Sequence, residues 1–203
     1  MVQSIRSHWP VPILIAVITF GSTVALCQRG ALTTLRPIDE LTQEATLIVH
    51  GSVISAKVEP HPQFHNLMTV LVTMHVVDTL KGKEQPTIQF RQYIWDIRDQ
   101  LDAAQYAKNE ELVLLLGAVS PYGLRSPVGL EQGRFRVTRD RQGKALAANG
   151  TGNLRLFDAV NRRAIARGIK LSPQVTALAK QPSVAPVALS DLEDAIRSFS
   201  RTQ

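Results

Sequence analysis

The chain has 203 residues, of which 44% are hydrophobic, and its 23 Lys and Arg residues outnumber 17 Asp and Glu residues for a net charge of +6. This length and apolar content predict one domain with its own hydrophobic core. Cys27 is the only cysteine, which excludes an internal disulfide, so the fold must depend on that core.

The first 25 residues have the order of a cleavable export signal. One basic residue, Arg6, precedes an apolar run at 11–20 and a stretch of small residues at 21–25. We predict cleavage after Ala25 and a periplasmic or extracellular location, with membrane contact only through the signal during export. Two alternatives are an uncleaved membrane anchor, which needs about 20 apolar residues, and acylation of Cys27, which prefers a small residue where this chain has Leu26.

The first half of the exported chain predicts one helix and three strands. The helix should begin near Pro37, because proline suits a first helical turn and apolar residues follow at helical spacing. Strands that are rich in β-branched residues or alternate between apolar and polar positions follow at 47–58, 67–80 and 87–95. Gly51 should mark a bulge in the first strand. The prolines of 59–66 make that segment a connection, since proline cannot donate to a ladder.

The second half begins with a polar segment at 96–108, which predicts a short helix or an ordered loop. Residues 112–116 are apolar at every position, which predicts a central strand covered on both faces. A Gly- and Pro-rich loop at 117–129 leads to a hairpin with strands at 133–138 and 144–148, then a turn at 149–150, and 154–157 is a short strand or an irregular packing segment. A Pro-containing linker at 172–186 precedes an amphipathic helix within 187–203, which a capping box from Ser190 to Glu193 should open.

These elements predict a mainly β fold, a small barrel or sandwich of about five or six strands with a helix at each end. The barrel alternative agrees with a family resemblance. Residues 45–53 resemble the opening A-D-x-I-V-x-G-x-V of a group of uncharacterised exported bacterial proteins, and three later segments resemble its L-K-G, G-E-x-V-x-L-F-L and Q-G-x-F-x-V motifs, at 79–82, 109–116 and 132–137. Asn109 stands in place of a family glycine and can adopt the same left-handed backbone.

The strand order of that group is similar to the OB-fold barrel of tissue inhibitors of metalloproteinases and netrin-like domains. The resemblance implies that residues 26–171 form an OB-like barrel. It also implies that an extracytoplasmic protease is a potential partner, since the inhibitor family binds proteases. In that family an N-terminal cysteine reaches the catalytic zinc, whereas Cys27 lacks a disulfide partner, so the inhibitory chemistry does not transfer.

Four histidines are candidate metal ligands. His61 and His65 are four residues apart, and His50 and His75 lie elsewhere, which is the pattern of a metal-dependent enzyme. The prolines around His61 exclude a helical pair of ligands, so we interpret the loop histidines as solvated and expect no metal and no cofactor.

Two surfaces are candidates for binding. Arg134 and Arg136 lie on one face of a hairpin with further basic residues, which suggests a solvated basic face or a polyanion-binding surface. Arg91, Tyr93 and Trp95 could stack on bases or anchor a protein partner. Nucleic acid is excluded as a partner because the chain is poor in aromatic residues and exported. For Tyr93 and Trp95, the favoured interpretation is burial beneath the segment that follows residue 96.

Catalytic motifs are missing from the sequence: there is no G-x-S-x-G elbow, H-E-x-x-H pair or P-loop. We therefore expect a non-enzymatic, exported binding module with an extracytoplasmic protein as its potential partner. Its candidate binding residues are Arg91, Tyr93, Trp95, Arg134 and Arg136. The alternatives are the metal-dependent enzyme and the polyanion-binding surface protein.

Overall fold

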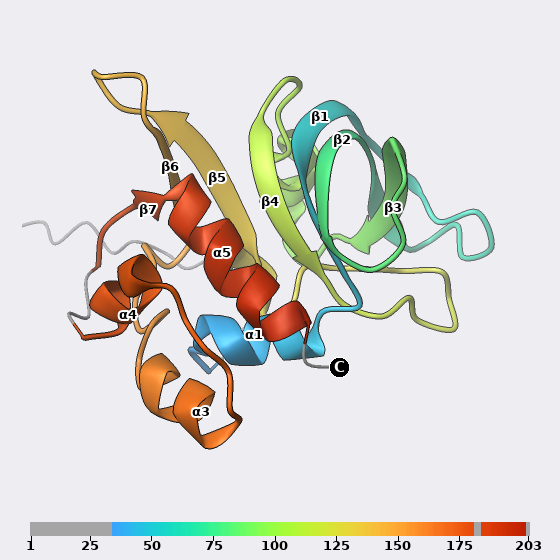
Figure 1. Ribbon diagram of the computed structural model, residues 1–203. Coiled ribbons are helices and arrows are strands. Elements are labelled where there is room, and N and C mark those ends of the chain that lie inside the picture. The colour runs from blue at the N-terminus through green and yellow to red at the C-terminus, as the bar shows by residue number, and fades with distance from the viewer. Residues whose placement is uncertain (1–33, 181–183, 202–203) are drawn as a thin grey trace, which may run out of the picture.

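The computed structural model describes residues 34–180 and 184–201, in which seven antiparallel strands form one sheet (Figure 1). The strand order is β3-β2-β1-β4-β5-β6-β7. The strands are β1 Leu47–Pro60, β2 Met68–Lys81, β3 Thr87–Tyr93, β4 Glu111–Leu116, β5 Arg134–Arg139, β6 Ala145–Asn149 and β7 Val187–Ala188. The prediction of a mainly β fold is confirmed. The strands number seven, however, and the sheet ends at β3 and β7 without closing on itself.

Five α-helices accompany the sheet in the described residues. They are α1 Ile38–Glu44, α2 Ile97–Leu101, α3 Val160–Ala166, α4 Pro173–Lys180 and α5 Leu189–Ser200. Helix α5 crosses one face of the sheet, between the strongly curved β1–β4 portion and the β5–β7 portion (Figure 1). The helices predicted near Pro37 and at the C-terminal end are confirmed as α1 and α5. None of the described helices is long and apolar enough to cross a membrane.

Strand β4 separates two hydrophobic cores, as its uninterrupted apolar sequence predicts. Leu112, Leu114 and Leu116 pack into the core that β1, β2 and β3 enclose. Val113 and Leu115 pack into a second core with α1, α3, α4 and α5. All five side chains are fully buried, so a side chain on either face of β4 meets apolar neighbours.

Gly51 allows β1 to approach β2 closely at a register shift, as the predicted bulge requires. A Cβ atom at this position would lie 2.0 Å from the carbonyl oxygen of His75. The left-handed backbone predicted for Asn109 is also present, with φ of 66°. Both local features follow from residue types that tolerate these backbones.

The linker predicted at 172–186 is wrong for its first half, because residues 173–180 form α4. Pro173 is the first residue of this helix, and Ser172 Oγ accepts a hydrogen bond from the Val175 N–H at 3.3 Å. Serine followed by proline is a helix start, not a linker, when apolar residues follow at helical spacing. Helix α3 was not predicted, and residues 154–157 are the irregular packing segment, with Leu156 and Phe157 buried.

The capping box predicted for the last helix is also wrong. Helix α5 begins at Leu189, and its N-cap residue, Ala188, makes no side-chain cap hydrogen bond. Ser190 therefore lies inside the helix, and the Glu193 carboxylate pairs with His50. The turn at Asn149 is confirmed: its side-chain oxygen accepts from the backbone N–H groups of Thr151 and Asn153. The signal at 1–25 and Cys27 lie outside the described residues.

Candidate functional site

Tyr93 and Trp95 extend from the end of β3 and pack edge to face. Their ring centroids are 4.8 Å apart and the planes meet at 87°. Ile94 between them is buried in the core, so Tyr93 and Trp95 point to the opposite, outer face. Trp95 is 58% exposed and Tyr93 is half-buried. The interpretation that both lie beneath the segment after residue 96 is therefore wrong for Trp95.

Arg91, on the same outer face, fixes the position of β3 against its neighbours. Its guanidinium donates to Thr69 Oγ1 at 2.8 Å and pairs with Glu59 Oε1 at 2.6 Å. Its carbonyl oxygen accepts from the Arg125 N–H at 2.8 Å. The charge of Arg91 is thus matched by Glu59, and its role in the structure is to join β1, β2, β3 and the 117–126 loop.

A second aromatic pair lies on two loops. Phe64, in the β1–β2 connection, meets Tyr122 edge on, with ring centroids 5.5 Å apart. His61 ties these loops together, because its Nε2 lies 2.8 Å from the Tyr122 carbonyl oxygen while its Nδ1 accepts from the Phe64 N–H at 3.3 Å. His61 is 4% exposed, so its interpretation as a solvated loop histidine is wrong. Its three backbone bonds leave neither ring nitrogen free for a metal.

The two aromatic pairs lie at the same end of the β1–β2–β3 portion. The Ile94 N–H donates to the Met68 carbonyl, and the His61 N–H donates to the Leu67 carbonyl, so β3 ends where the β1–β2 connection begins. We call this surface the aromatic end and define it as Phe64, Tyr93, Trp95 and Tyr122. The loops that carry Phe64 and Tyr122 project from the right-hand side of Figure 1.

Helix α2, which follows the aromatic end, adds further exposed apolar side chains. Ile97 is 71% exposed and Leu101 is 88% exposed. Neither residue is among the predicted site residues, although Ile97 and Leu101 follow Trp95 by only two and six positions in the sequence. The signal that could have identified them is the apolar spacing of Ile97 and Leu101 on a five-residue helix that is otherwise polar.

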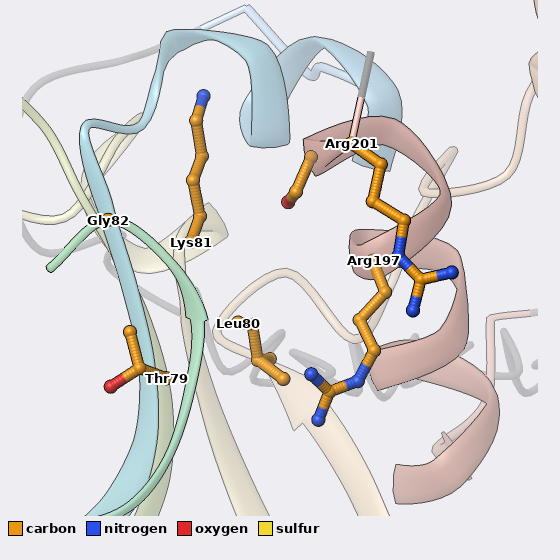
Figure 2. Close-up of a pocket in the computed structure, with 7 residues that line it drawn as sticks. Thr79, Leu80, Lys81, Gly82, Arg197 and Arg201 are labelled. Carbon is orange, nitrogen blue, oxygen red and sulfur yellow. The ribbon is translucent and has the colours of Figure 1, made fainter. Parts of the chain in front are cut away.

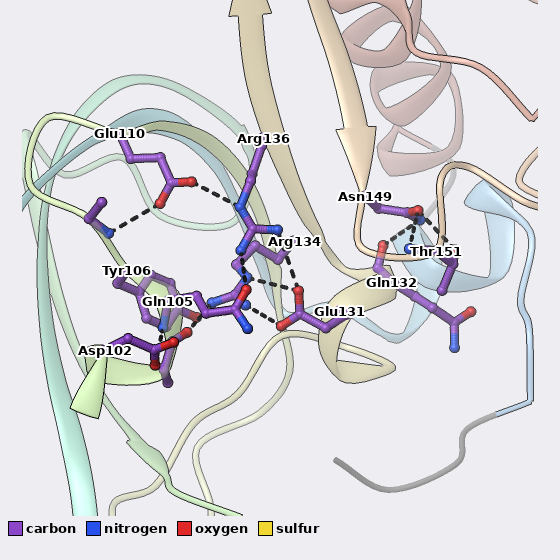
Figure 3. Close-up of polar contacts among 12 residues, drawn as sticks. Asp102, Gln105, Tyr106, Glu110, Glu131, Gln132, Arg134, Arg136, Asn149 and Thr151 are labelled. Atoms are coloured by element: carbon purple, nitrogen blue, oxygen red, sulfur yellow. Dashed lines mark hydrogen bonds and ion pairs between the residues drawn. The ribbon is translucent and has the colours of Figure 1, made fainter. Parts of the chain in front are cut away.

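Arg134 is not on a solvated basic face, which corrects the prediction for this residue. Its side chain is 2% exposed and lies over the Tyr106 ring, with the guanidinium carbon 4.6 Å from the ring centroid. Its Nη1 donates to the Ala104 carbonyl at 2.7 Å, and it pairs with Glu131 (Figure 3). Arg136 is partly exposed and pairs with Glu110 at 2.9 Å.

The contacts of Arg134 link β5 to β3, although these two strands are not neighbours in the sheet. Arg134 on β5 contacts Tyr106, whose hydroxyl donates to Gln92 Oε1 on β3 at 2.8 Å. Burial raises the pKa of Tyr106 to about 12, so this hydroxyl is a proton donor at neutral pH. Residues 103–105 have φ values of 50°, 53° and 62°, a left-handed turn that the Arg134 contact with Ala104 holds in place.

A small basic pocket of about 260 Å³ lies between the end of β2 and the last turns of α5 (Figure 2). The Lys81 ammonium donates to the carbonyls of Thr42 and Gln43 at 2.9 and 3.2 Å, at the C-terminal end of α1, and burial lowers its pKa. Arg197 pairs with Asp78. These cations therefore serve the fold, because positive charge at a helix C-terminus stabilises it.

The alternative of a metal-dependent enzyme finds no ligand cluster among the described residues. Within residues 34–180 and 184–201, no group of three His, Cys, Asp or Glu residues is arranged to hold a metal ion. His75 lies exposed on β2 and His65 lies exposed in the β1–β2 connection. His50 contacts Glu111 and Glu193, as described below.

Comparison with known proteins adds no assignment, since no protein-family model, curated protein or solved structure matches this chain. The resemblance to exported bacterial proteins and to the OB fold of protease inhibitors therefore stays a prediction from the sequence. The aromatic end joins Tyr93 and Trp95, which were predicted as site residues, with Phe64 and Tyr122, which were not.

Proposed function

We propose that this protein is an exported, non-enzymatic binding module and that its aromatic end contacts a protein partner outside the cytoplasm. The observation that carries the proposal is Trp95, which is 58% exposed yet held edge to face against Tyr93 at the end of a strand. Aromatic side chains in fixed orientations supply large contact areas at a small cost in conformational entropy, and they dominate the binding energy of protein interfaces.

The surroundings of Trp95 support a protein partner over a small ligand. Tyr122, Ile97 and Leu101 are all more than half exposed, so the apolar surface is spread over a strand end, a loop and a helix. Neither of the two described pockets is lined by a residue of the aromatic end. A spread apolar surface fits the face of another protein, whereas small ligands bind in concave sites.

The partner class follows from the resemblance to protease inhibitors, and we propose an extracytoplasmic protease. The strand order supports an OB-like origin for the first five strands, which would form a partly open barrel. Strand β1 pairs with both β2 and β4, and β5 lies beyond β4. Strands β3 and β5 do not pair with each other. The side chains of Gln92, Tyr106 and Arg134 connect them instead.

Trp95 provides a direct test, because Trp9 is the other tryptophan of the chain and lies in the predicted signal. The processed protein then has one fluorescent indole, at the proposed site. We expect a blue shift of its emission and protection from acrylamide quenching when exported proteases of the producing cell are added one at a time. A partner that binds without altering Trp95 fluorescence would contradict the proposal.

A pair of variants separates binding from folding. Trp95→Ala should reduce retention of the protease on the immobilised protein at least about 30-fold, the loss typical of a central aromatic contact. The matched control is Ile165→Ala, because Ile165 is 69% exposed on α3, and this change should leave retention unchanged. Equal retention by both variants would refute the aromatic end as the site. Stoichiometric zinc that is lost on His61→Ala would instead support the metal-dependent enzyme.

A further inference from the structure

His50 lies between two carboxylates that come from different elements. Its Nε2 is 2.9 Å from Glu111 Oε1 on β4, and its Nδ1 is 2.9 Å from Glu193 Oε1 on α5. An ionised carboxylate can only accept a hydrogen bond, so two ionised partners take both ring nitrogens as donors. A neutral imidazole has a single N–H, and therefore this geometry requires the doubly protonated imidazolium.

The same contact region contains a second, complementary ion pair. His50 and Asp78 are direct partners in the β1–β2 register, and Glu193 and Arg197 lie one turn apart on α5. His50 pairs with Glu193, and Asp78 pairs with Arg197. The charges thus alternate on both surfaces, an arrangement that aligns the helix on the hairpin and that requires a positive charge on His50.

We propose that His50 is a proton-dependent clasp that fastens the C-terminal helix α5 to the sheet. When the imidazolium releases one proton to solvent, it keeps one N–H for two carboxylates, and one of the two bonds is lost. Glu111 has a second partner in Arg139, at 3.0 Å, whereas within the described residues Glu193 pairs with His50. The attachment of α5 therefore changes from an ion pair with the imidazolium to at most one hydrogen bond from a neutral imidazole.

The surrounding groups and solvent access agree with this role. The charged groups that face the clasp are Asp78 on β2, Glu111 on β4, Arg139 on β5, Lys144 just before β6, and Glu193 and Arg197 on α5. A groove of about 450 Å³, lined by His50, Glu193, Asp78 and Lys144, opens beside the imidazole. The buried His50 side chain thus has a route for proton exchange with water.

The direction of the effect follows from the pKa of His50, which its hydrogen bond with Glu193 raises above 6.5, with burial opposing and Glu111 reinforcing the shift. A group whose pKa is higher in the folded protein adds stability that is complete below its unfolded value. The contribution is therefore fully present below pH 6.5 and is lost as the pH rises through the raised folded value. Stability should fall on the alkaline side.

The test is the urea midpoint of the purified full chain as a function of pH, followed by far-ultraviolet circular dichroism. The midpoint should fall as the pH rises above 6.5, and His50→Gln should abolish most of that fall, since glutamine cannot take up the proton. His75→Gln is the matched control, because His75 is exposed on the neighbouring strand β2, and it should keep the slope of the native chain. An unchanged slope in His50→Gln would overturn the proposal.

Two further measurements keep the test decisive if His50→Gln does not fold. Glu193→Gln preserves the shape of the side chain but removes its charge, so the pH slope should shrink while the protein stays folded in acid. Nitrogen-15 NMR of the native protein should show both ring nitrogens of His50 protonated at a pH above 6.5. A single protonated nitrogen at that pH, or an undiminished slope in Glu193→Gln, would refute the clasp.

Discussion

Replacing Arg134 by methionine should destabilise the protein strongly, although sequence reasoning places this residue on the surface. Methionine retains much of the side-chain volume but loses the cation–π contact with Tyr106 and the bond to the Ala104 carbonyl. The lost cation–π contact is worth about 1–2 kcal/mol, and an unsatisfied buried carbonyl costs about 1–3 kcal/mol. We expect a total loss of about 2–5 kcal/mol in the free energy of unfolding. Glu131 adds little to this sum, because it is partly exposed and lies 3.6 Å from Arg136.

The matched control is Arg136→Met, two residues along the same face of β5. Arg136 is partly exposed and pairs with Glu110, and exposed pairs of this kind contribute about 1 kcal/mol or less. Both variants can be compared by urea unfolding monitored through the fluorescence of Trp95. A midpoint for Arg134→Met as high as that of Arg136→Met would refute the view that Arg134 is a buried tie between β3 and β5.

Two other predictions address single positions. Gly51→Ala should cost about 1–3 kcal/mol, since the new Cβ would lie 2.0 Å from the His75 carbonyl oxygen and overpacking costs this much. Gly117→Ala, whose nearest neighbour would be 3.6 Å away, should unfold at nearly the native urea midpoint. Burial raises the pKa of Tyr106 to about 12, so the folded chain resists ionisation of this hydroxyl. The free energy of unfolding should therefore fall as the pH rises above the ordinary value of 10.0. Alkaline unfolding followed by phenolate absorbance should therefore shift to higher pH in Tyr106→Phe, and an identical curve would contradict the burial of the hydroxyl.

The parts of the fold that the sequence predicts are those set by neighbours in the chain. Alternation along 67–80 identifies β2, and the uninterrupted apolar run at 112–116 identifies β4 as covered on both faces. Helix α4 was within reach of the same reasoning, because Ser172 and Pro173 form a helix start. The three prolines at 173, 182 and 186 favour a linker in the sequence, and this pattern masks the helix start.

The errors at the candidate sites have a different cause, which is tertiary contact. Arg134 is covered by Ala104 and Tyr106, which lie about thirty residues away in the chain. Its burial therefore depends on a contact that local sequence does not reveal. Glu193 has the spacing of a capping residue after Ser190, but the helix begins one residue before Ser190 and the Glu193 carboxylate pairs with His50. Periodicity describes which face a side chain occupies, and it carries no information about which distant group covers that face.

The positions of the aromatic residues show how these distant contacts bear on binding. Arg91 fixes the strand that carries Tyr93, and His61 fixes the two loops that carry Phe64 and Tyr122, all through groups outside the rings themselves. The ordering of both loops is thus part of folding, and a partner that meets the aromatic end does not have to supply it again. Ordering of loops and side chains is one of the main costs of association, so under the proposed function less of the contact energy would be offset by this cost. The contacts of His61, in a segment that looks like an irregular connection in the sequence, therefore fix the two loops that carry the rings of the proposed site.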